Sequence, residues 1–329
     1  MLLIGKTTGI LFVAHLLLAA PHEDMKYTQA PPRLRRSGGY PKFPFTSPVP
    51  VISCGTREVE HHPHRNGAPY PKIVGGTETS YGAYPWQVEI EILKYGAKSY
   101  EHHCGGAIIS ERLIVTAAHC LQSYDPERLR VTVGKHRRSQ HNKYEQVFRV
   151  DKILLHPKFR RDGYYSHDIG LLKLKATGDK GISYNSHVRP ICLPAAHTRN
   201  AAGTWCTVTG WGAQKPQDME SLSDVLLAAY VPLLEQETCR TKEVYGDRDQ
   251  AILDGMLCAG LLEGGVDACG GDSGGPLACE VDGRFVLTGL VSWGDGCAKP
   301  SKPGVYTRIS HYVDWIHASF KKLGLQQEL

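Results

Sequence analysis

Short apolar runs alternate with polar punctuation along most of this chain. From Ile73 onward, stretches rich in Val, Ile and Leu are separated by Gly, Pro, Asn and Asp. Successive side chains of a strand point to opposite faces, so this pattern predicts half-buried β-strands. The runs are PWQVEIEIL (85–93), GAIISERLIVTAAHC (106–120), RLRVTVG (128–134), VFRVDKILL (147–155), WCTVTGW (205–211) and FVLTGLVSW (285–293). We therefore expect an all-β body.

One helix is expected close to the end of the sequence. Between Ser310 and about Lys322, the residues Val313, Ile316 and Phe320 recur at helical spacing. That spacing places all three on one face, which predicts a closing helix packed against the strands.

The first 72 residues have a different character. Residues 1–20 carry Lys6 and then an apolar run from Gly9 to Ala20, a length and polarity that suit a secretory signal. Residues 21–72 are rich in Pro, Arg, Lys and His and cannot bury enough apolar surface to offset chain entropy. We expect a disordered pro-segment there, followed by one domain over residues 73–329.

Two basic features of the pro-segment have alternative explanations. Arg33-Leu34-Arg35-Arg36 is typical of a furin-type processing site, and a solvated basic linker explains it as well. His61, His62 and His64 suggest a metal site, but a histidine-bearing linker is the favoured interpretation.

Composition narrows the classes of function. The 329 residues carry a net charge of +5, which is too small to indicate nucleic-acid binding. No apolar run reaches 18 residues, so no membrane span is predicted. CxxC pairs and HExxH are absent, which leaves zinc without support, and no cofactor is expected. Ten cysteines, an even number, indicate disulfides and an oxidising, extracellular location for a secreted protein.

The candidate chemistry begins with VDACGGDSGGPL, residues 266–277. A serine hydroxyl needs a general base and donors for the oxyanion that it creates. Gly271 beside Asp272 and Ser273 suits the second need, because glycine lets the backbone turn so that neighbouring N–H groups converge. An ordinary Gly-rich turn is the simpler alternative.

Two further motifs favour the catalytic interpretation. VTAAHC (115–120) contains His119, and HDIGLLKL (167–174) contains Asp168. The order His119, Asp168, Ser273 is the chymotrypsin order of a Ser-His-Asp triad. From Ile73 to about Ile316 the chain resembles the trypsin-like, chymotrypsin-fold serine proteases. It is more similar to regulatory mosaic-type members such as neurotrypsin than to digestive trypsin.

The resemblance implies a fold and a set of roles. It implies two six-stranded antiparallel β-barrels with the active site between them. Ser273 would attack the scissile carbonyl, His119 would carry its proton, and Asp168 would orient the histidine. The N–H groups of Gly271 and Ser273 would form the oxyanion hole.

The resemblance also implies an activation junction at Lys72-Ile73-Val74-Gly75-Gly76. Cleavage after Lys72 would give Ile73 an ammonium group that pairs with Asp272, since a buried carboxylate without a partner is costly. The uncut form would then hold its oxyanion site in disorder. An apolar strand followed by a turn is the alternative for IVGG.

Asp267 lies where the family has the floor of its primary specificity pocket. A carboxylate there favours arginine or lysine, with Gly294 and Gly304 leaving room for a long side chain. Ala268 lacks a hydroxyl that many relatives use to solvate lysine, so arginine is expected over lysine. Inefficient self-activation after Lys72 then requires an activating protease. A surface-loop role is the alternative for Asp267.

Four neighbours would shape the remaining subsites. Gly270 would open the pocket rim, and Tyr165 would narrow the second subsite to small residues or proline. Trp293 would form a wall along which substrate backbone pairs with Ser292 and Gly294.

The resemblance, and not the spacing, implies the disulfide pairing. The implied pairs are Cys54–Cys192, Cys104–Cys120, Cys206–Cys279, Cys239–Cys258 and Cys269–Cys297, which use all ten cysteines. The first pair would tether the pro-segment to the domain after cleavage.

The loop of residues 134–145 corresponds to the calcium loop of trypsin. Lys135 and Asn142 replace two acidic ligands, so no calcium is expected. Basic residues at 135–143 resemble an anion-binding exosite for an acidic protein or a glycosaminoglycan, although a solvated charged face is the usual explanation. Protein substrates and serpin-type inhibitors are the other partners implied. A catalytically silent binding homologue is the alternative function.

Overall fold

The computed structural model describes residues 53–61, 76–176, 178, 180–215 and 218–326. The expected signal peptide and basic processing site lie outside this part of the chain, as do most of the pro-segment, His62, His64 and the Lys72–Ile73 junction.

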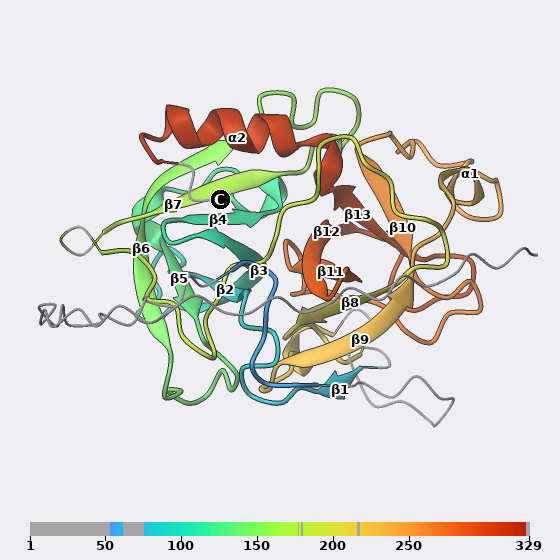
Figure 1. Ribbon diagram of the computed structural model, residues 1–329. Coiled ribbons are helices and arrows are strands. Elements are labelled where there is room, and N and C mark those ends of the chain that lie inside the picture. The colour runs from blue at the N-terminus through green and yellow to red at the C-terminus, as the bar shows by residue number, and fades with distance from the viewer. Residues whose placement is uncertain (1–52, 62–75, 177, 179, 216–217, 327–329) are drawn as a thin grey trace, which may run out of the picture. The chain divides into compact units, whose positions relative to one another are not determined.

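The first half of the domain forms a closed antiparallel barrel in the order β2-β3-β4-β7-β6-β5 (Figure 1). Val88, Ile90 and Val131 point inward and are fully buried, as the alternation of the runs predicts. The six strands are β2 (Gln87–Ile92), β3 (Glu101–Ser110), β4 (Leu113–Thr116), β5 (Leu129–Val133), β6 (Gln146–Leu155) and β7 (Gly170–Leu174).

The second half forms a seven-stranded antiparallel sheet, in the order β1-β9-β8-β11-β12-β13-β10. Its strands are β1 (Thr77–Glu78), β8 (Trp205–Gly210), β9 (Leu227–Pro232), β10 (Met256–Ala259), β11 (Pro276–Val281), β12 (Arg284–Trp293) and β13 (Gly304–Arg308). A bridge between Leu233, which directly follows β9, and Ala259 of β10 links the edge strand β10 back toward β9. The all-β prediction is confirmed, whereas the second barrel differs from the expected six closed strands.

Helical structure is short apart from the closing helix. The C-terminal helix α2 (Val313–Lys322) buries Val313, Ile316 and Phe320, as predicted. It begins three residues later than expected, because residues 309–311 form a 3₁₀ turn, η4 (Ile309–His311). The others are α1 (Gln236–Cys239), η1 (Ala118–Cys120), η2 (Pro126–Arg128) and η3 (Met219–Ser221). No helix in the described ranges is long and apolar enough to cross a membrane.

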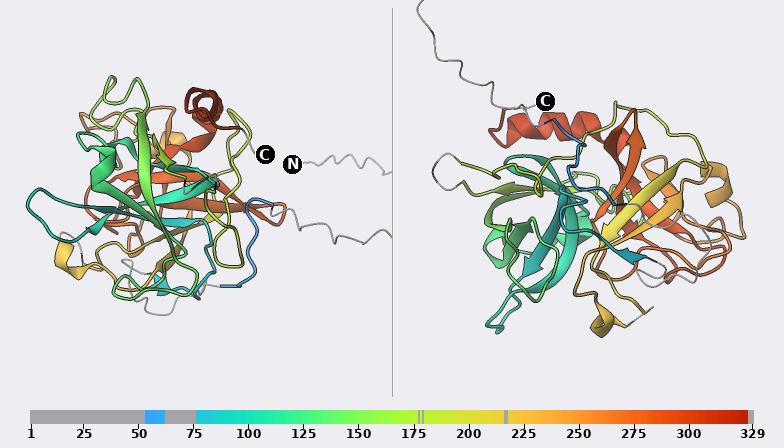
Figure 2. Two further views of the ribbon diagram at one scale, coloured as in Figure 1. Left: turned by 90° about the vertical axis from the view of Figure 1, so that its left-hand side faces the viewer. Right: turned by 60° about the horizontal axis from the view of Figure 1, so that its bottom comes forward.

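An apolar core joins the two halves, which lie side by side in Figure 1 and in the right-hand view of Figure 2. Trp86 precedes β2 in the first half and Trp211 follows β8 in the second, and both are fully buried in one cluster with Phe285. The active-site motifs lie on segments that border this junction. The structure contains five disulfides, with the pairings that the resemblance implies.

Candidate active site

His119 and Asp168 come from the first barrel and are joined by two hydrogen bonds. His119 lies in η1, directly after β4, and its Nδ1 lies 2.7 Å from Asp168 Oδ2. The backbone N–H of His119 donates to Asp168 Oδ1 at 2.8 Å. Asp168 is buried, and Ser292 Oγ donates to its Oδ2 at 2.6 Å. The carboxylate therefore fixes both the position and the tautomer of the imidazole.

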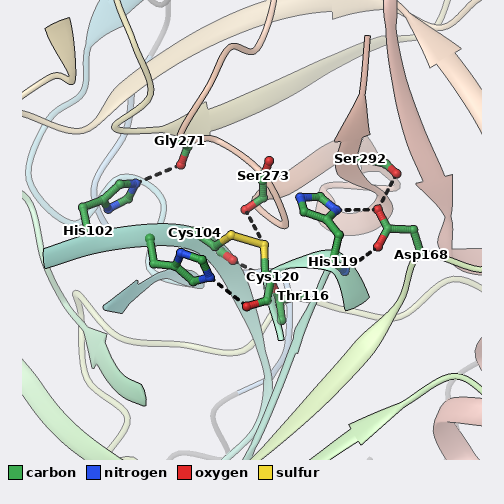
Figure 3. Close-up of a disulfide and its surroundings, with 11 residues drawn as sticks. His102, Cys104, Thr116, His119, Cys120, Asp168, Gly271, Ser273 and Ser292 are labelled. Carbon is green, nitrogen blue, oxygen red and sulfur yellow. Dashed lines mark hydrogen bonds and ion pairs between the residues drawn. A yellow bond between two sulfur atoms is a disulfide. The ribbon is translucent and has the colours of Figure 1, made fainter. Parts of the chain in front are cut away.

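Ser273 comes from the second half and lies beside His119, on the side away from Asp168 (Figure 3). Both side chains line one cavity of about 320 Å³. The carbonyl of Ser273 accepts from Gly105 N of β3 at 2.8 Å, so the first barrel holds the serine loop. Gly274 must be glycine, because an added Cβ would lie 2.0 Å from Thr116 Oγ1. The structure thus brings the three predicted triad residues together.

The oxyanion donors flank Asp272. Gly271 has φ +96°, a conformation that favours glycine. The preceding carbonyl, that of Gly270, accepts from Ala213 N at 2.7 Å. Since a trans peptide points its C=O and N–H in opposite directions, this bond turns Gly271 N–H away from Ala213. Neither Gly271 N–H nor Ser273 N–H donates to another of the described residues.

The Asp272 side chain is buried behind this loop. Its carboxylate accepts from Gly212 N at 2.7 Å and from Cys269 N at 2.9 Å. Burial raises the pKa of Asp272 to about 6, although these two hydrogen bonds and the charge of His102 act in the opposite direction. A buried carboxyl with a raised pKa would be stabilised in its ionised form by a further cation.

Asp267 lies deep in the same cavity with one oxygen unused. Oδ2 accepts from Ala298 N at 3.1 Å, while Oδ1 is buried and has no partner. Burial raises the pKa of Asp267 to about 7, against the hydrogen bond from the Ala298 N–H group. An incoming ammonium or guanidinium group would satisfy both the charge and the free oxygen.

The two pocket glycines differ in what an added side chain would meet. A Cβ on Gly304 would lie 2.7 Å from Asp267 Oδ1, so a side chain there would block the carboxylate. A Cβ on Gly294 would meet nothing closer than 3.4 Å, so chain packing does not require that glycine. The space beside Gly294 is open to a substrate. Ala268 and Gly270 also line the cavity.

Aromatic rings bound the next part of the cleft. Tyr165 and Trp293 stack with centroids 5.9 Å apart and an interplanar angle of 13°. Tyr165 also meets His119 edge-on at 6.0 Å. The space beside His119 is therefore flat and apolar, in keeping with the narrow second subsite that the sequence predicts.

The loop of residues 134–145 is occupied by its own cation. Lys135 Nζ lies 3.1 Å from Glu145 Oε2 and donates to Gln140 O at 3.2 Å. Burial opposes the ionisation of Glu145, but hydrogen bonds from Asn142 and Lys135 lower its pKa overall. Arg137 pairs with Glu78 and Asp224, at 3.3 and 3.5 Å. These charges are therefore largely balanced within the protein.

In the described ranges, side chains with the spacing of metal ligands gather at one place. The one His/Cys/acid group with suitable spacing is Cys104, His119 and Cys120, and its two sulfurs form a disulfide. His61, the described member of the pro-segment histidines, meets the Tyr84 ring edge-on.

Three polar groups at this site were not identified from the sequence. They are Ala213 N, which binds Gly270 O, His102, which binds Gly271 O, and Glu89, which binds His102. Glu89 occurs in the alternating run QVEIEI, where the pattern assigns it to the face away from the barrel core. That face is covered by the second half of the domain, which the alternation alone does not reveal.

Comparisons with known proteins agree with this geometry. The family model described as trypsin matches residues 73–316. Bovine coagulation factor XI is 41% identical over 248 residues, covering 74% of this chain and 37% of that protein. Guinea pig coagulation factor XII is 42% identical, covering 74% and 40%. Chicken urokinase-type plasminogen activator is 38% identical, covering 78% and 59%. The chain thus spans about two fifths to three fifths of the length of these relatives.

Proposed function

This chain belongs to the trypsin family of serine proteases, and we propose that it is a secreted endopeptidase that cleaves after arginine in preference to lysine. The observation that carries the specificity is the buried, unpartnered Oδ1 of Asp267 in the cavity that Ser273 and His119 also line. Arginine is favoured because its guanidinium can donate two parallel hydrogen bonds to a carboxylate.

The residues divide the reaction into two acyl transfers. Ser273 Oγ attacks the scissile carbonyl while His119 Nε2 accepts the hydroxyl proton. The oxyanion binds the N–H groups of Gly271 and Ser273, and Asp168 stabilises the imidazolium. His119 then protonates the leaving amine, so that the C–N bond breaks and an acyl-enzyme remains. Water attacks the ester by the same route and releases the acid.

We propose further that the protein is made as a zymogen, with a signal peptide at 1–20 and a pro-segment at 21–72. Cleavage after Lys72 would supply the Ile73 ammonium group. Asp272 supports this proposal, because it is buried with a raised pKa beside the oxyanion glycine. Cys54 would keep the two chains joined through Cys192. An activating protease and serpin-type inhibitors are the partners that follow.

The basic loop gives weaker support for an anion-binding exosite. Lys135, Arg137 and Arg138 have acidic partners, and Lys143 packs over the Tyr144 ring. We propose that this surface is chiefly structural. Retention on heparin that a small increase in salt concentration abolishes would agree, whereas retention that persists to high salt concentration would favour an exosite.

Cleavage of the purified chain with a lysine-specific protease tests the main proposal. Matched arginyl and lysyl esters should be hydrolysed only after cleavage, and faster for arginine. Ser273→Ala should lower kcat by about 10⁶. A catalytically silent binding homologue would instead fail to react with an active-site serine reagent after the same cut. Activity of the uncut chain equal to that of the cut chain would contradict the zymogen.

A further inference from the structure

A row of polar side chains, buried at Glu89 and His102 and 25% exposed at Arg138, connects the loop of residues 134–145 to the oxyanion glycine. Arg138 Nε lies 3.4 Å from Glu89 Oε1, and the same oxygen lies 3.0 Å from His102 Nδ1. His102 Nε2 lies 2.8 Å from the carbonyl oxygen of Gly271. The side chains of Glu89 and His102 are 3% and 1% exposed. We call Arg138, Glu89 and His102 the buried relay.

The hydrogen bonds of the buried relay fix its direction. A carbonyl oxygen only accepts, so His102 Nε2 carries a proton and donates a hydrogen bond to Gly271 O. Figure 3 shows the His102 ring pointing at that carbonyl. The Glu89 carboxylate lies within hydrogen-bond distance of Nδ1 and so holds the ring in this orientation, as carboxylates do for many functional histidines.

The carbonyl that His102 binds belongs to the peptide that follows Gly271. The peptide that precedes Gly271 is held on its own carbonyl, where Ala213 N donates to Gly270 O at 2.7 Å. Two hydrogen bonds therefore fix the planes on both sides of Gly271, the residue that would donate one oxyanion N–H. Because glycine adopts either sign of φ readily, loss of one bond would let this N–H turn away.

We propose that Glu89 is a positioning residue for the oxyanion hole, acting through His102, and that Arg138 extends its support to the surface loop of residues 134–145. This inference rests on the proposed protease function. Arg138 also contacts the second half of the domain, since its N–H donates to Asp224 O at 2.7 Å and its Nη1 to Ser223 O at 3.3 Å. The buried relay thus links both halves to one catalytic peptide.

The test compares two inhibitors of the cleaved enzyme. A peptidyl arginine aldehyde forms a tetrahedral adduct with Ser273 whose oxyanion needs the hole. Benzamidine needs only the Asp267 pocket. Glu89→Leu should lower kcat for an arginyl ester about 10- to 100-fold, less than the 10²–10³ typical of deleting a donor. KM and benzamidine affinity should change by less than about threefold, while aldehyde affinity falls in parallel with kcat.

Conservative variants separate positioning from simple packing. In Glu89→Gln, the amide N–H can donate to Nδ1, and the Nε2–H group keeps its hydrogen bond to Gly271 O. This variant should therefore keep most of the activity. Arg138→Met should lower kcat and aldehyde affinity together by a smaller factor, about 3- to 10-fold. If Glu89→Leu does not fold, the same ratio measured for Arg138→Met, with Glu89→Gln as its control, decides the question.

Two failures are distinguishable. An active wild type whose Glu89→Leu and Arg138→Met variants keep the wild-type ratio of aldehyde to benzamidine affinity would overturn this inference alone. A cleaved wild type that does not hydrolyse the arginyl ester would overturn the proposed function, and the inference with it.

Discussion

At the scale of single residues, the protonation state of Asp267 controls how tightly a cation binds in the specificity pocket. Because burial raises its pKa to about 7, a proton competes with the cation below that pH. Benzamidine affinity should therefore fall by up to about tenfold for each pH unit below 7 and level off above it. Competition assays between pH 5 and 8 measure this directly.

The control for this prediction separates Asp267 from the catalytic histidine. Asp267→Asn should bind benzamidine weakly at every pH, whereas His119→Gln should keep the wild-type pH dependence. An affinity that stays constant between pH 5 and 8 in the wild type would contradict the assignment.

Ala268 sets the choice between the two basic side chains. It is buried beside Asp267 and offers no hydroxyl to a lysine ammonium group. Ala268→Ser should raise the lysine-to-arginine ratio of kcat/KM by roughly fivefold, the value of one hydrogen bond of about 1 kcal/mol. Ala268→Gly, which adds no hydroxyl, is the control. An unchanged ratio in Ala268→Ser would show that the arginine preference has another source.

At the scale of elements, the alternating runs were sufficient to predict strands. RLRVTVG became β5 and WCTVTGW became β8, since Val, Ile and Leu on one face find a core in either half. The sequence could not reveal which outward face is covered. Glu89 lies on such a face, where it is buried against His102 of the neighbouring strand β3.

Short length explains why the sequence did not predict two elements of the structure, β1 and α1. β1 has two residues and α1 has four, too few for periodicity to register. The triad was predictable for the opposite reason, because His119, Asp168 and Ser273 each lie in a motif with a distinctive local composition. The hydrogen bond of Ser292 to Asp168 was not predictable, since the two residues lie 124 positions apart along the chain.

The loop of residues 134–145 gives a prediction at this scale. Lys135 and Asn142 both hydrogen-bond Glu145 Oε2, so this carboxylate oxygen already has a cation of the loop as its partner. Lys135→Glu with Asn142→Glu removes the ammonium and adds two carboxylates. Calcium should then raise the unfolding free energy, by about 2.7 kcal/mol at a hundred times the Kd. Thermal unfolding with and without calcium measures it.

The matched control replaces the same two residues by glutamine, which removes the ammonium without adding charge. That variant and the wild type should be insensitive to calcium. Equal stabilisation of the glutamine control would show that the carboxylates are not the ligands.

At the scale of the whole molecule, residues 53–61 already behave as part of the domain. Gly55 N donates to Pro190 O at 2.8 Å, and Phe285 N donates to Gly55 O at 2.9 Å. Arg57 lies over the Phe285 ring at 4.5 Å, and Cys54 is bonded to Cys192. Cleavage after Lys72 would therefore release no part of the chain. The cut and uncut forms can be compared as the same set of atoms plus one water.

That comparison isolates the charge on Asp272. Its pKa in the folded chain is raised from 3.8 to about 6, mainly by burial. Ionisation then costs the uncut form stability as the pH rises from 4 to about 6, up to about 3 kcal/mol for a shift of two units. A new Ile73 ammonium beside Asp272 would lower this pKa and remove the cost. The stability gained on cleavage should therefore be small at pH 4 and reach its full value by pH 7.

Denaturant unfolding of both forms in a Ser273→Ala background, which prevents self-digestion, measures this gain across the pH range. A cleaved sample with its new terminus carbamylated keeps the broken chain but lacks the charge, so its stability should follow the uncut curve. Cleavage also creates a carboxylate on Lys72, but the carbamylated control carries the same group, so comparison with that control isolates the Ile73 charge. A gain that is equal at pH 4 and pH 7 would place the origin of activation somewhere other than the Asp272 carboxylate.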